Sequence, residues 1–307
     1  MSAGADGSDP SPPAVTRVEV PVDTRAATGT TNAYLAGGLL VDPAARTDAL
    51  DAAVAERGSA AAAHGSAADD PPTHGSAREE SRIEAIAVTH THPDHVGAVA
   101  DYAARTGATV HAHADHVERF REATGIDPDA TFRDGDAIGT TGVRALDTPG
   151  HAPDHVAFAV GGGDGGDGNG GGESGGDETE RPAEALVGDL AVAEGSVVVG
   201  APEGDLREYL ASLERVRDGG FVRLHPGHGP PIDDPSATCD RLIDHRLERE
   251  RRVLAAVEAG SNDVDAVLEA AYDRDVTGVE DLARATVRAH LEKLTAEGRI
   301  DASWTRG

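Results

Sequence analysis

Short apolar runs separated by polar, Gly-rich or Pro-rich segments dominate the chain as far as residue 235. Runs of about four to eight residues, some alternating and some continuously apolar, predict strands. The expected strands are Val15–Val22, Asn32–Ala36, Leu39–Asp42, Ile83–Thr89, Thr109–His113, Val143–Asp147, His155–Val160, Ala185–Val187 and Val222–His225. Helix-like stretches such as Val96–Arg105 lie between several of them, so the pattern favours the α/β class.

The pattern changes to helical spacing after Pro235. Helices are expected at Cys239–Glu258, Asp263–Tyr272 and Val279–Glu297, followed by a short strand at Arg299–Trp304. Helices followed by a hairpin-like tail predict a small winged-helix domain over residues 236–307, after a catalytic domain over residues 15–235. The third helix carries Arg284, Arg288 and Lys293. It either approaches a phosphate backbone or packs on the catalytic domain or on a second subunit of a homo-oligomer.

Low-complexity sequence interrupts this organisation. Residues 1–14 predict a disordered N-terminus, and the lack of an apolar core there argues against a signal peptide. Residues 57–80 and 161–182 read as insertions in the catalytic domain, because they hold too few apolar residues to form a core. Cys239 is the only cysteine, and no apolar run of about 20 residues is present. We therefore expect a cytoplasmic protein with no membrane partner.

The chain is strongly acidic. The 307 residues include 55 Asp and Glu against 27 Lys and Arg, which gives a net charge of -28, and Lys293 is the only lysine. Because 38% of the residues are apolar, this acidity indicates a folded protein with an acidic shell. Self-repulsion of this kind is screened at molar salt, where the Debye length is about 3 Å. We therefore expect a halophilic protein, whose acidity weakens the case for nucleic-acid binding without excluding it.

One short run contains most of the residues that could bind a metal. It reads Thr-His-Thr-His-Pro-Asp-His and places His90, His92, Asp94 and His95 in an H-x-H-x-D-H pattern between an expected strand and an expected helix. Loops at such positions often carry function. Neutral imidazoles and a carboxylate suit zinc, manganese or iron(II). Alternate residues of an extended loop can face different points, so the run can serve two adjacent metals.

Two metals need more ligands than one loop supplies, and three candidates recur later in the chain. His151, Asp189 and His228 each follow a glycine near the end of an expected strand. Glycine lets the chain turn sharply and present the next side chain. Strands that alternate with helices and end in such residues predict an αββα sandwich, in which two sheets face each other with helices outside and metals at one edge.

This ordered set of elements resembles the metallo-β-lactamase superfamily over roughly residues 15–235. The segments Thr31–Leu35, Pro149–His155 and His245–Glu250 also look like the beta-lactamase-like protein 2 branch, which carries a C-terminal winged helix. The resemblance implies the metallo-β-lactamase fold and metal-dependent hydrolysis.

The resemblance also implies a role for each candidate ligand. It assigns His90, His92 and His151 to one metal, Asp94, His95 and His228 to the other, and Asp189 to both as a bridge. The implied cofactors are two divalent ions, zinc in the first place, with manganese or iron as alternatives. Such ions lie about 3.5 to 4 Å apart and lower the pKa of a bound water to about 7. Asp94 and Asp189 would then position the bound hydroxide, which is the expected nucleophile.

A second copy of the motif complicates the assignment. His111, His113, Asp115 and His116 match the same H-x-H-x-D-H expression. His111 and His113 continue an apolar run and read as strand residues, so we expect no metal there.

Other polar residues near the ligands admit simpler interpretations. His225 could replace His228, but it fits a strand end with no ligand role. Asp154 and His155 either orient His151 or are plain polar loop residues. Asn32 and Tyr34 read as structural residues.

The substrate stays open at this point. The beta-lactamase-like protein 2 resemblance implies cleavage of single-stranded RNA, whereas a glyoxalase II resemblance would imply a small-molecule thioester or ester. Glyoxalase II usually continues Thr-x-Gly-Ser after the third metal histidine, and residues 152–155 depart from this, which favours RNA. A winged-helix regulator with a degenerate metal domain is a third alternative, although none of the seven candidate ligands is missing.

Overall fold

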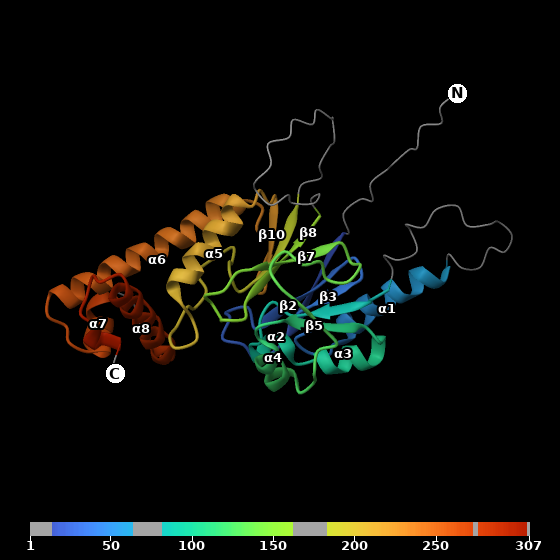
Figure 1. The fold of residues 1–307 in the computed structure, drawn as a ribbon, viewed down its shortest axis with the longest axis horizontal. Coiled ribbons are helices and arrows are strands. Elements are labelled where there is room, and N and C mark those ends of the chain that lie inside the picture. Colours follow the sequence, from blue (N-terminus) through green and yellow to red (C-terminus); the bar gives the residue numbers. More distant parts are fainter. Residues whose placement is uncertain (1–13, 64–81, 162–182, 273–275, 306–307) are drawn as a thin grey trace, which may run out of the picture.

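The computed structural model describes residues 14–63, 82–161, 183–272 and 276–305 (Figure 1). The expected N-terminal tail lies outside these residues apart from Ala14, as does most of the expected insertions at 57–80 and 161–182. Residues 57–63 continue helix α1 (Asp48–Ala63). In the described part of the chain, no helix is long and apolar enough to cross a membrane.

Two sheets form the inner layers of the fold. The first sheet has the order β1-β2-β3-β4-β5-β6 and the second the order β10-β9-β8-β7. The strands of the first are β1 (Val15–Pro21), β2 (Thr30–Ala36), β3 (Leu39–Val41), β4 (Ala85–Ala87), β5 (Thr109–His113) and β6 (Ala130–Phe132). Those of the second are β7 (Val143–Asp147), β8 (Val156–Val160), β9 (Glu184–Gly188) and β10 (Arg223–Pro226). Strands β3 to β6 are parallel, and β10 pairs in parallel with β9.

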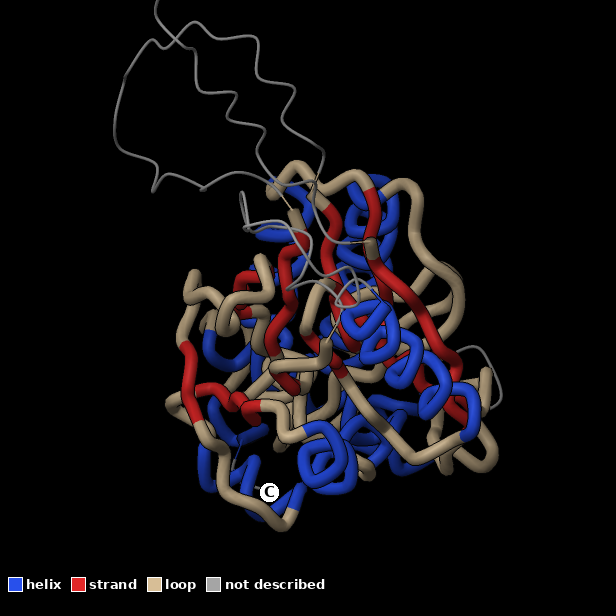
Figure 2. Tube along the Cα trace, turned by 90° about the vertical axis from the view of Figure 1, so that its right-hand side faces the viewer, coloured by secondary structure: helices blue, strands red, loops and turns tan. Residues whose placement is uncertain are grey.

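Helices cover the outer faces of both sheets (Figure 2). Buried residues of α1, α3 (Val99–Thr106) and α4 (Val117–Thr124) share a core with the first sheet. Residues of α5 (Leu206–Asp218) and the start of α6 (Pro235–Glu258) share a core with the second. A third cluster, including Tyr34, Phe158 and Leu186, lies between the sheets. The predicted αββα sandwich is therefore confirmed.

Strand β6 was not expected from the sequence. Of its three residues only Phe132 is buried, so the segment has no periodic apolar signal. It joins the sheet through pairing with β5, in which His111 lies opposite Ala130 and His113 opposite Phe132.

The C-terminal region is helical, as predicted. Helix α6 runs from the second sheet to α7 (Val264–Ala271) and α8 (Glu280–Ala296) at one end of the molecule (Figure 1). Its first turns bury Cys239 and Leu242 in the catalytic core, whereas Val253 and Ala256 pack with α7 and α8. One helix therefore belongs to both cores.

The expected strand at Arg299–Trp304 is wrong. Ala302–Thr305 instead forms a 3-10 helix, η1. The carboxylate of Asp301 accepts a hydrogen bond from the backbone N–H of Ser303, which favours a helical turn, while Ile300 and Trp304 pack on the C-terminal core. Among the described residues no strand follows β10, so this part of the chain contains no wing.

Candidate metal centre

The H-x-H-x-D-H run leaves the buried strand β4 and enters the single turn of helix α2 (Pro93–Val96). His92 is the residue before the helix and has an extended backbone, and Pro93 occupies the first helical position. Proline is preorganised for that position because its φ is fixed near the helical value. The extended part of the loop therefore presents His90 and His92, and the turn presents Asp94 and His95.

Three imidazoles converge on one point. Nδ1 of His92 lies 2.9 Å from Nε2 of His90 and 3.0 Å from Nε2 of His151. Ring nitrogens this close cannot all satisfy one another, because a neutral imidazole has one donor and one acceptor. A cation that accepts three lone pairs resolves this arrangement, and the three residues form a group that could hold an ion.

A second group lies beside the first and contains Asp94, His95 and His228. Nε2 of His228 lies 3.6 Å from Oδ2 of Asp94. Two ligands on one tetrahedral metal, each about 2.1 Å from it, are separated by about 3.4 Å. The spacing in this group therefore suits a shared ion better than a direct hydrogen bond.

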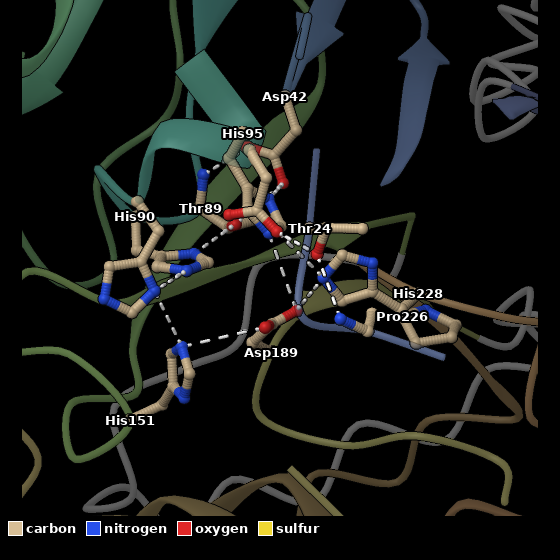
Figure 3. A network of polar contacts seen from close by, with 12 residues as sticks. Thr24, Asp42, Thr89, His90, His95, His151, Asp189, Pro226 and His228 are labelled. Carbon is tan, nitrogen blue, oxygen red and sulfur yellow. Dashed lines mark hydrogen bonds and ion pairs between the residues drawn. The ribbon is translucent and has the colours of Figure 1, made fainter. Parts of the chain in front are cut away.

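Asp189 lies between the two groups (Figure 3). Its Oδ1 is 3.6 Å from Nε2 of His95 and 3.4 Å from Nε2 of His228, whereas its Oδ2 is 3.7 Å from Nε2 of His151. One carboxylate oxygen thus faces each trio. Nε2 of His95 and Oδ1 of Asp189 are also buried and have no hydrogen-bond partner among the described residues. Orphaned buried polar atoms are costly unless a ligand satisfies them, so the residues fit a dinuclear metal site.

Each histidine of the two trios uses its other ring nitrogen to contact the protein. Where the partner is a carboxylate or carbonyl oxygen it can only accept, so that nitrogen donates and the second one is left facing the centre, where it could bind an ion once deprotonated. The pairs are His90 Nδ1 with Thr89 Oγ1 at 3.1 Å, His92 Nε2 with Glu203 Oε2 at 3.2 Å, His95 Nδ1 with Asp42 Oδ2 at 2.9 Å, His151 Nδ1 with Val198 O at 2.8 Å, and His228 Nδ1 with Thr30 O at 2.8 Å.

Burial and neighbouring charges set the protonation of the site. Burial, together with nearby imidazoles, holds the pKa of His90 well below its usual value, and burial also lowers the pKa of His151. Burial lowers the pKa of His95 too, but Asp42 and Asp189 outweigh it and raise the pKa to about 9. Burial would raise the pKa of Asp189, but His228 and the other imidazoles hold that pKa far below its usual range. His90 and His151 are therefore neutral near pH 7, whereas His95 and Asp189 carry opposite charges.

Two glycines next to ligands are required by close packing. Gly188 has φ 46°, and a Cβ there would lie 2.5 Å from Oγ1 of Thr89. A Cβ on Gly227 would lie 2.6 Å from Oδ1 of Asp189. Any side chain at these positions would displace the centre, which explains the glycines before Asp189 and His228.

Sequence reasoning missed Asp42 and Glu203. Oδ1 and Oδ2 of Asp42 accept hydrogen bonds from the backbone N–H and the hydroxyl of Thr89, in addition to the contact with His95. Asp42 could have been identified from the sequence, because it is a carboxylate at the end of an expected strand. The same criterion identified the candidate ligands. Glu203 contacts both His92 and Arg119, and the hydrogen bond with His92 is the main cause that lowers its pKa to about 2.

Asn32 and Tyr34 hold the loop that carries His228. Nδ2 of Asn32 donates to the carbonyl oxygens of Pro226 and Gly229, and the hydroxyl of Tyr34 donates to the same Pro226 oxygen. Their expected structural role therefore has a direct bearing on the site. His225 points elsewhere, with Nε2 2.7 Å from Oε2 of Glu184.

Asp154 and His155 also support the centre, but not through His151. Asp154 accepts hydrogen bonds from the backbone and hydroxyl of Thr91. Nε2 of His155 accepts one from the backbone N–H of Asp189 at 3.1 Å, and burial lowers the pKa of this imidazole to about 3. A neutral His155 can therefore hold the Asp189 backbone in place.

The second copy of the motif is not part of the centre. Of the described residues that could group around an ion, none is His111, His113 or His116. Nε2 of His113 instead lies 3.2 Å from Oδ1 of Asp147, and its ring packs against Phe132.

Comparisons with known proteins agree with this fold and site. Residues 28–166 match the family model described as metallo-beta-lactamase superfamily, so the chain carries a domain of this superfamily. The fold and the cluster of histidines and carboxylates resemble those of this superfamily, and the cluster could hold divalent metal. The crystal structure of a metallo-beta-lactamase family protein from Thermus thermophilus matches with a TM-score of 0.61 and 25% identity, covering 92% of this chain and 94% of that one.

The chain is also similar to two curated proteins. The chain is 28% identical over 240 residues to the beta-lactamase-like protein 2 homolog of Drosophila melanogaster, covering 74% of this chain and 73% of the relative. It is also 28% identical over 190 residues to the atrochrysone carboxyl ACP thioesterase of Aspergillus fumigatus, covering 59% of this chain and 50% of that one.

Proposed function

We propose that this protein is a dinuclear metal hydrolase, with zinc favoured over manganese or iron. The observation that carries the proposal is the position of Asp189, whose two carboxylate oxygens face the two ligand trios. Two divalent ions held there would supply Lewis-acid activation of water and of the electrophilic substrate group.

The chain's own residues would perform the remaining tasks. Asp42, Thr30 and Val198 fix the ring orientation of three histidines, so the ligand set is preorganised. Asp94 and Asp189 are the carboxylates that can accept a hydrogen bond from the attacking water and position it. Thr24 donates its hydroxyl hydrogen to Oδ2 of Asp94 and so holds that carboxylate in place.

Single-stranded RNA is the substrate that we propose. The support is the similarity to beta-lactamase-like protein 2 homologs, which extends over about three quarters of the chain. The departure of residues 152–155 from the glyoxalase II pattern points the same way.

Thioester hydrolysis is the second candidate. It is favoured by the similarity to a protein named as an acyl carrier protein thioesterase. That similarity covers only 59% of this chain, and it is shorter than the similarity to the first group.

Metal analysis tests the dinuclear centre, and paired activity assays test the substrate. The intact protein, purified in high salt, should contain about two divalent ions per chain, because seven ligands exceed one tetrahedral site. Asp189→Ala should lose metal and activity together. A stoichiometry near one, with Asp189→Ala still fully loaded, would refute the dinuclear centre. Labelled single-stranded RNA and a thioester panel, assayed on the same protein, decide the substrate.

A further inference from the structure

One loop contacts two of the three histidines in the first trio. It comprises residues 197–204, lies in the connection between β9 and α5, and is called the 197–204 loop below. The carbonyl oxygen of Val198 accepts the hydrogen bond from Nδ1 of His151 at 2.8 Å. Oε2 of Glu203 lies 3.2 Å from Nε2 of His92. The position of this loop therefore decides how both imidazole rings face the first metal.

The 197–204 loop rests directly on helix α8. The backbone N–H of Ala201 donates to the carbonyl oxygen of Ala285 at 3.0 Å. Gly200 lies against the same residue, because a Cβ on Gly200 would be only 2.8 Å from Cβ of Ala285. The φ of Gly200 is outside the left-handed region, so close packing on α8, and not the backbone conformation, requires a glycine here.

Helix α6 holds the same loop from a second direction. Arg246 is 3% exposed, and its guanidinium donates to the carbonyl oxygen of Val197, the residue before Val198. The guanidinium also lies 5.5 Å from the centre of the Tyr209 ring in α5. Breaking a buried hydrogen bond is costly, because the carbonyl group that remains loses its partner. The contact with Arg246 therefore fixes the loop next to the carbonyl group that orients His151.

Hydrogen bonds within and beside the loop make it move as one unit. The backbone N–H of Gly204 donates to the carbonyl oxygen of Gly200 at 2.8 Å. The backbone N–H of Asp205 donates at 3.0 Å to the carbonyl oxygen of Gly150, which directly precedes His151. A shift where the loop meets α8 would therefore reach the groups that contact His92 and His151.

Other segments orient the histidines of the second trio. Nδ1 of His95 contacts Asp42, and Nδ1 of His228 contacts the carbonyl oxygen of Thr30. Neither Asp42 nor Thr30 belongs to the 197–204 loop or to the C-terminal helices. Displacement of the loop should therefore weaken the first metal site more than the second.

We infer that Arg246 and Ala285, on the C-terminal helices, are positioning residues for the first metal site and act through the 197–204 loop. The inference deepens the proposed function and rests on it, because it assumes a metal ion at the first trio. It makes the C-terminal helices a part of the metal centre, although none of the candidate ligands lies on them.

Zinc titration of the metal-free full chain against a competing chelator tests this inference. Gly200→Ala places a Cβ against Ala285 and should displace the loop from α8. Combining Gly200→Ala with Ala285→Gly removes the opposing Cβ, which leaves the nearest atoms of residue 285 at 3.4 Å and 3.6 Å, close to ordinary contact. The control Gly219→Ala creates a similar overlap, 2.6 Å from the ring of Phe221, at the opposite end of α5 from the loop.

Gly200→Ala should lower the zinc affinity of one site by about 10 to 100 fold, the range typical for groups that orient metal ligands. The double variant should recover this affinity, although a glycine inside α8 lowers the melting temperature. Zinc affinity and stability would then change in opposite directions, which a merely structural role would not produce. Gly219→Ala should bind zinc like the intact protein.

A second variant tests the contact with α6 independently. Arg246→Met removes the donor to Val197 and keeps an apolar side chain in its place. It should weaken the same site as Gly200→Ala. Titration in a His228→Gln background, which removes a ligand of the second trio, assigns the weakened site to the first trio.

Three results would overturn the inference while the proposed dinuclear centre stands, provided that the intact protein binds two zinc ions. The first is intact zinc affinity in both Gly200→Ala and Arg246→Met. The second is a double variant that binds zinc no better than Gly200→Ala. The third is an equal loss of affinity in Gly219→Ala, which would indicate general destabilisation. If the intact protein binds no zinc, the proposed function and this inference fail together.

Discussion

Oδ2 of Asp42 lies 2.9 Å from Nδ1 of His95, and both side chains are buried. A carboxylate can only accept, so Nδ1 of His95 donates to Asp42, and Nε2, which faces Asp189, is the nitrogen that could bind a metal after losing its proton. The same carboxylate also accepts two hydrogen bonds from Thr89, which precedes the ligand His90. One buried carboxylate therefore aligns ligands of both trios.

Asp42→Asn should lower metal affinity by about 10 to 100 fold, the range typical for groups that orient metal ligands. An amide has one acceptor oxygen, so its NH₂ group must face a donor on either Thr89 or His95. Relief by a change of tautomer would place a proton on Nε2 of His95, where it competes with the metal. Titration of metal-free protein with zinc measures the effect.

Asp129→Asn is the matched control for this substitution. Oδ2 of Asp129 accepts from the backbone N–H of Val110, far from the candidate ligands, and an amide oxygen can do the same. The variant should bind zinc like the intact protein. Equal zinc affinity in Asp42→Asn would show that Asp42 does not align His95.

The two copies of the H-x-H-x-D-H motif should behave differently. Changing His90 and His92 to Gln should abolish binding at the first trio, because two of its three ligands are lost. Changing His111, His113 and His116 to Gln should leave metal content intact, since these residues lie outside the candidate metal groups in the described chain. Elemental analysis of both variants decides between the copies, and the reverse outcome would assign the metal to the second.

Tyr34→Phe should destabilise the protein by about 0.5 to 1.5 kcal/mol, the usual net value of one hydrogen bond. It should also weaken metal binding at the second trio, because the lost hydroxyl holds the loop of His228. Thermal unfolding with and without added metal separates the two effects.

Tyr102→Phe provides the comparison for Tyr34→Phe. Its hydroxyl donates to Oδ1 of Asp51 at 2.8 Å, away from the candidate ligands. A similar loss of stability is expected, with unchanged metal affinity. If both variants retain full metal affinity, the contact with Pro226 is structural only.

The melting temperature should rise with salt up to molar concentration. The net charge of -28 creates self-repulsion in the folded state, and about 1 M salt shortens the Debye length to about 3 Å. Calorimetry over a series of KCl concentrations measures this dependence. A melting temperature that stays constant or falls with KCl would contradict the expected halophilic character.

The sequence determined the local features of this protein. Apolar periodicity predicted the α/β class, nine of the ten strands found in the described residues and the three C-terminal helices, because alternation and helical spacing are properties of adjacent residues. The spacing of His90, His92, Asp94 and His95 marked the loop, and glycines before His151, Asp189 and His228 marked the other strand ends. The structure brings these seven residues together.

Only the tertiary structure revealed the groups that support and surround the centre. Asp42 contacts His95, which is 53 positions away in the sequence, and Asn32 contacts Pro226, which is 194 positions away. No local sequence pattern predicts either contact. The strand at Arg299–Trp304 was wrongly expected, because a short apolar tail is compatible with either a strand or a helical turn. The hydrogen bond to the carboxylate of Asp301 favours the turn. A sequence carries its short-range preferences at each position, whereas electrostatic and hydrogen-bond partners are set by distances that exist only after the chain has folded.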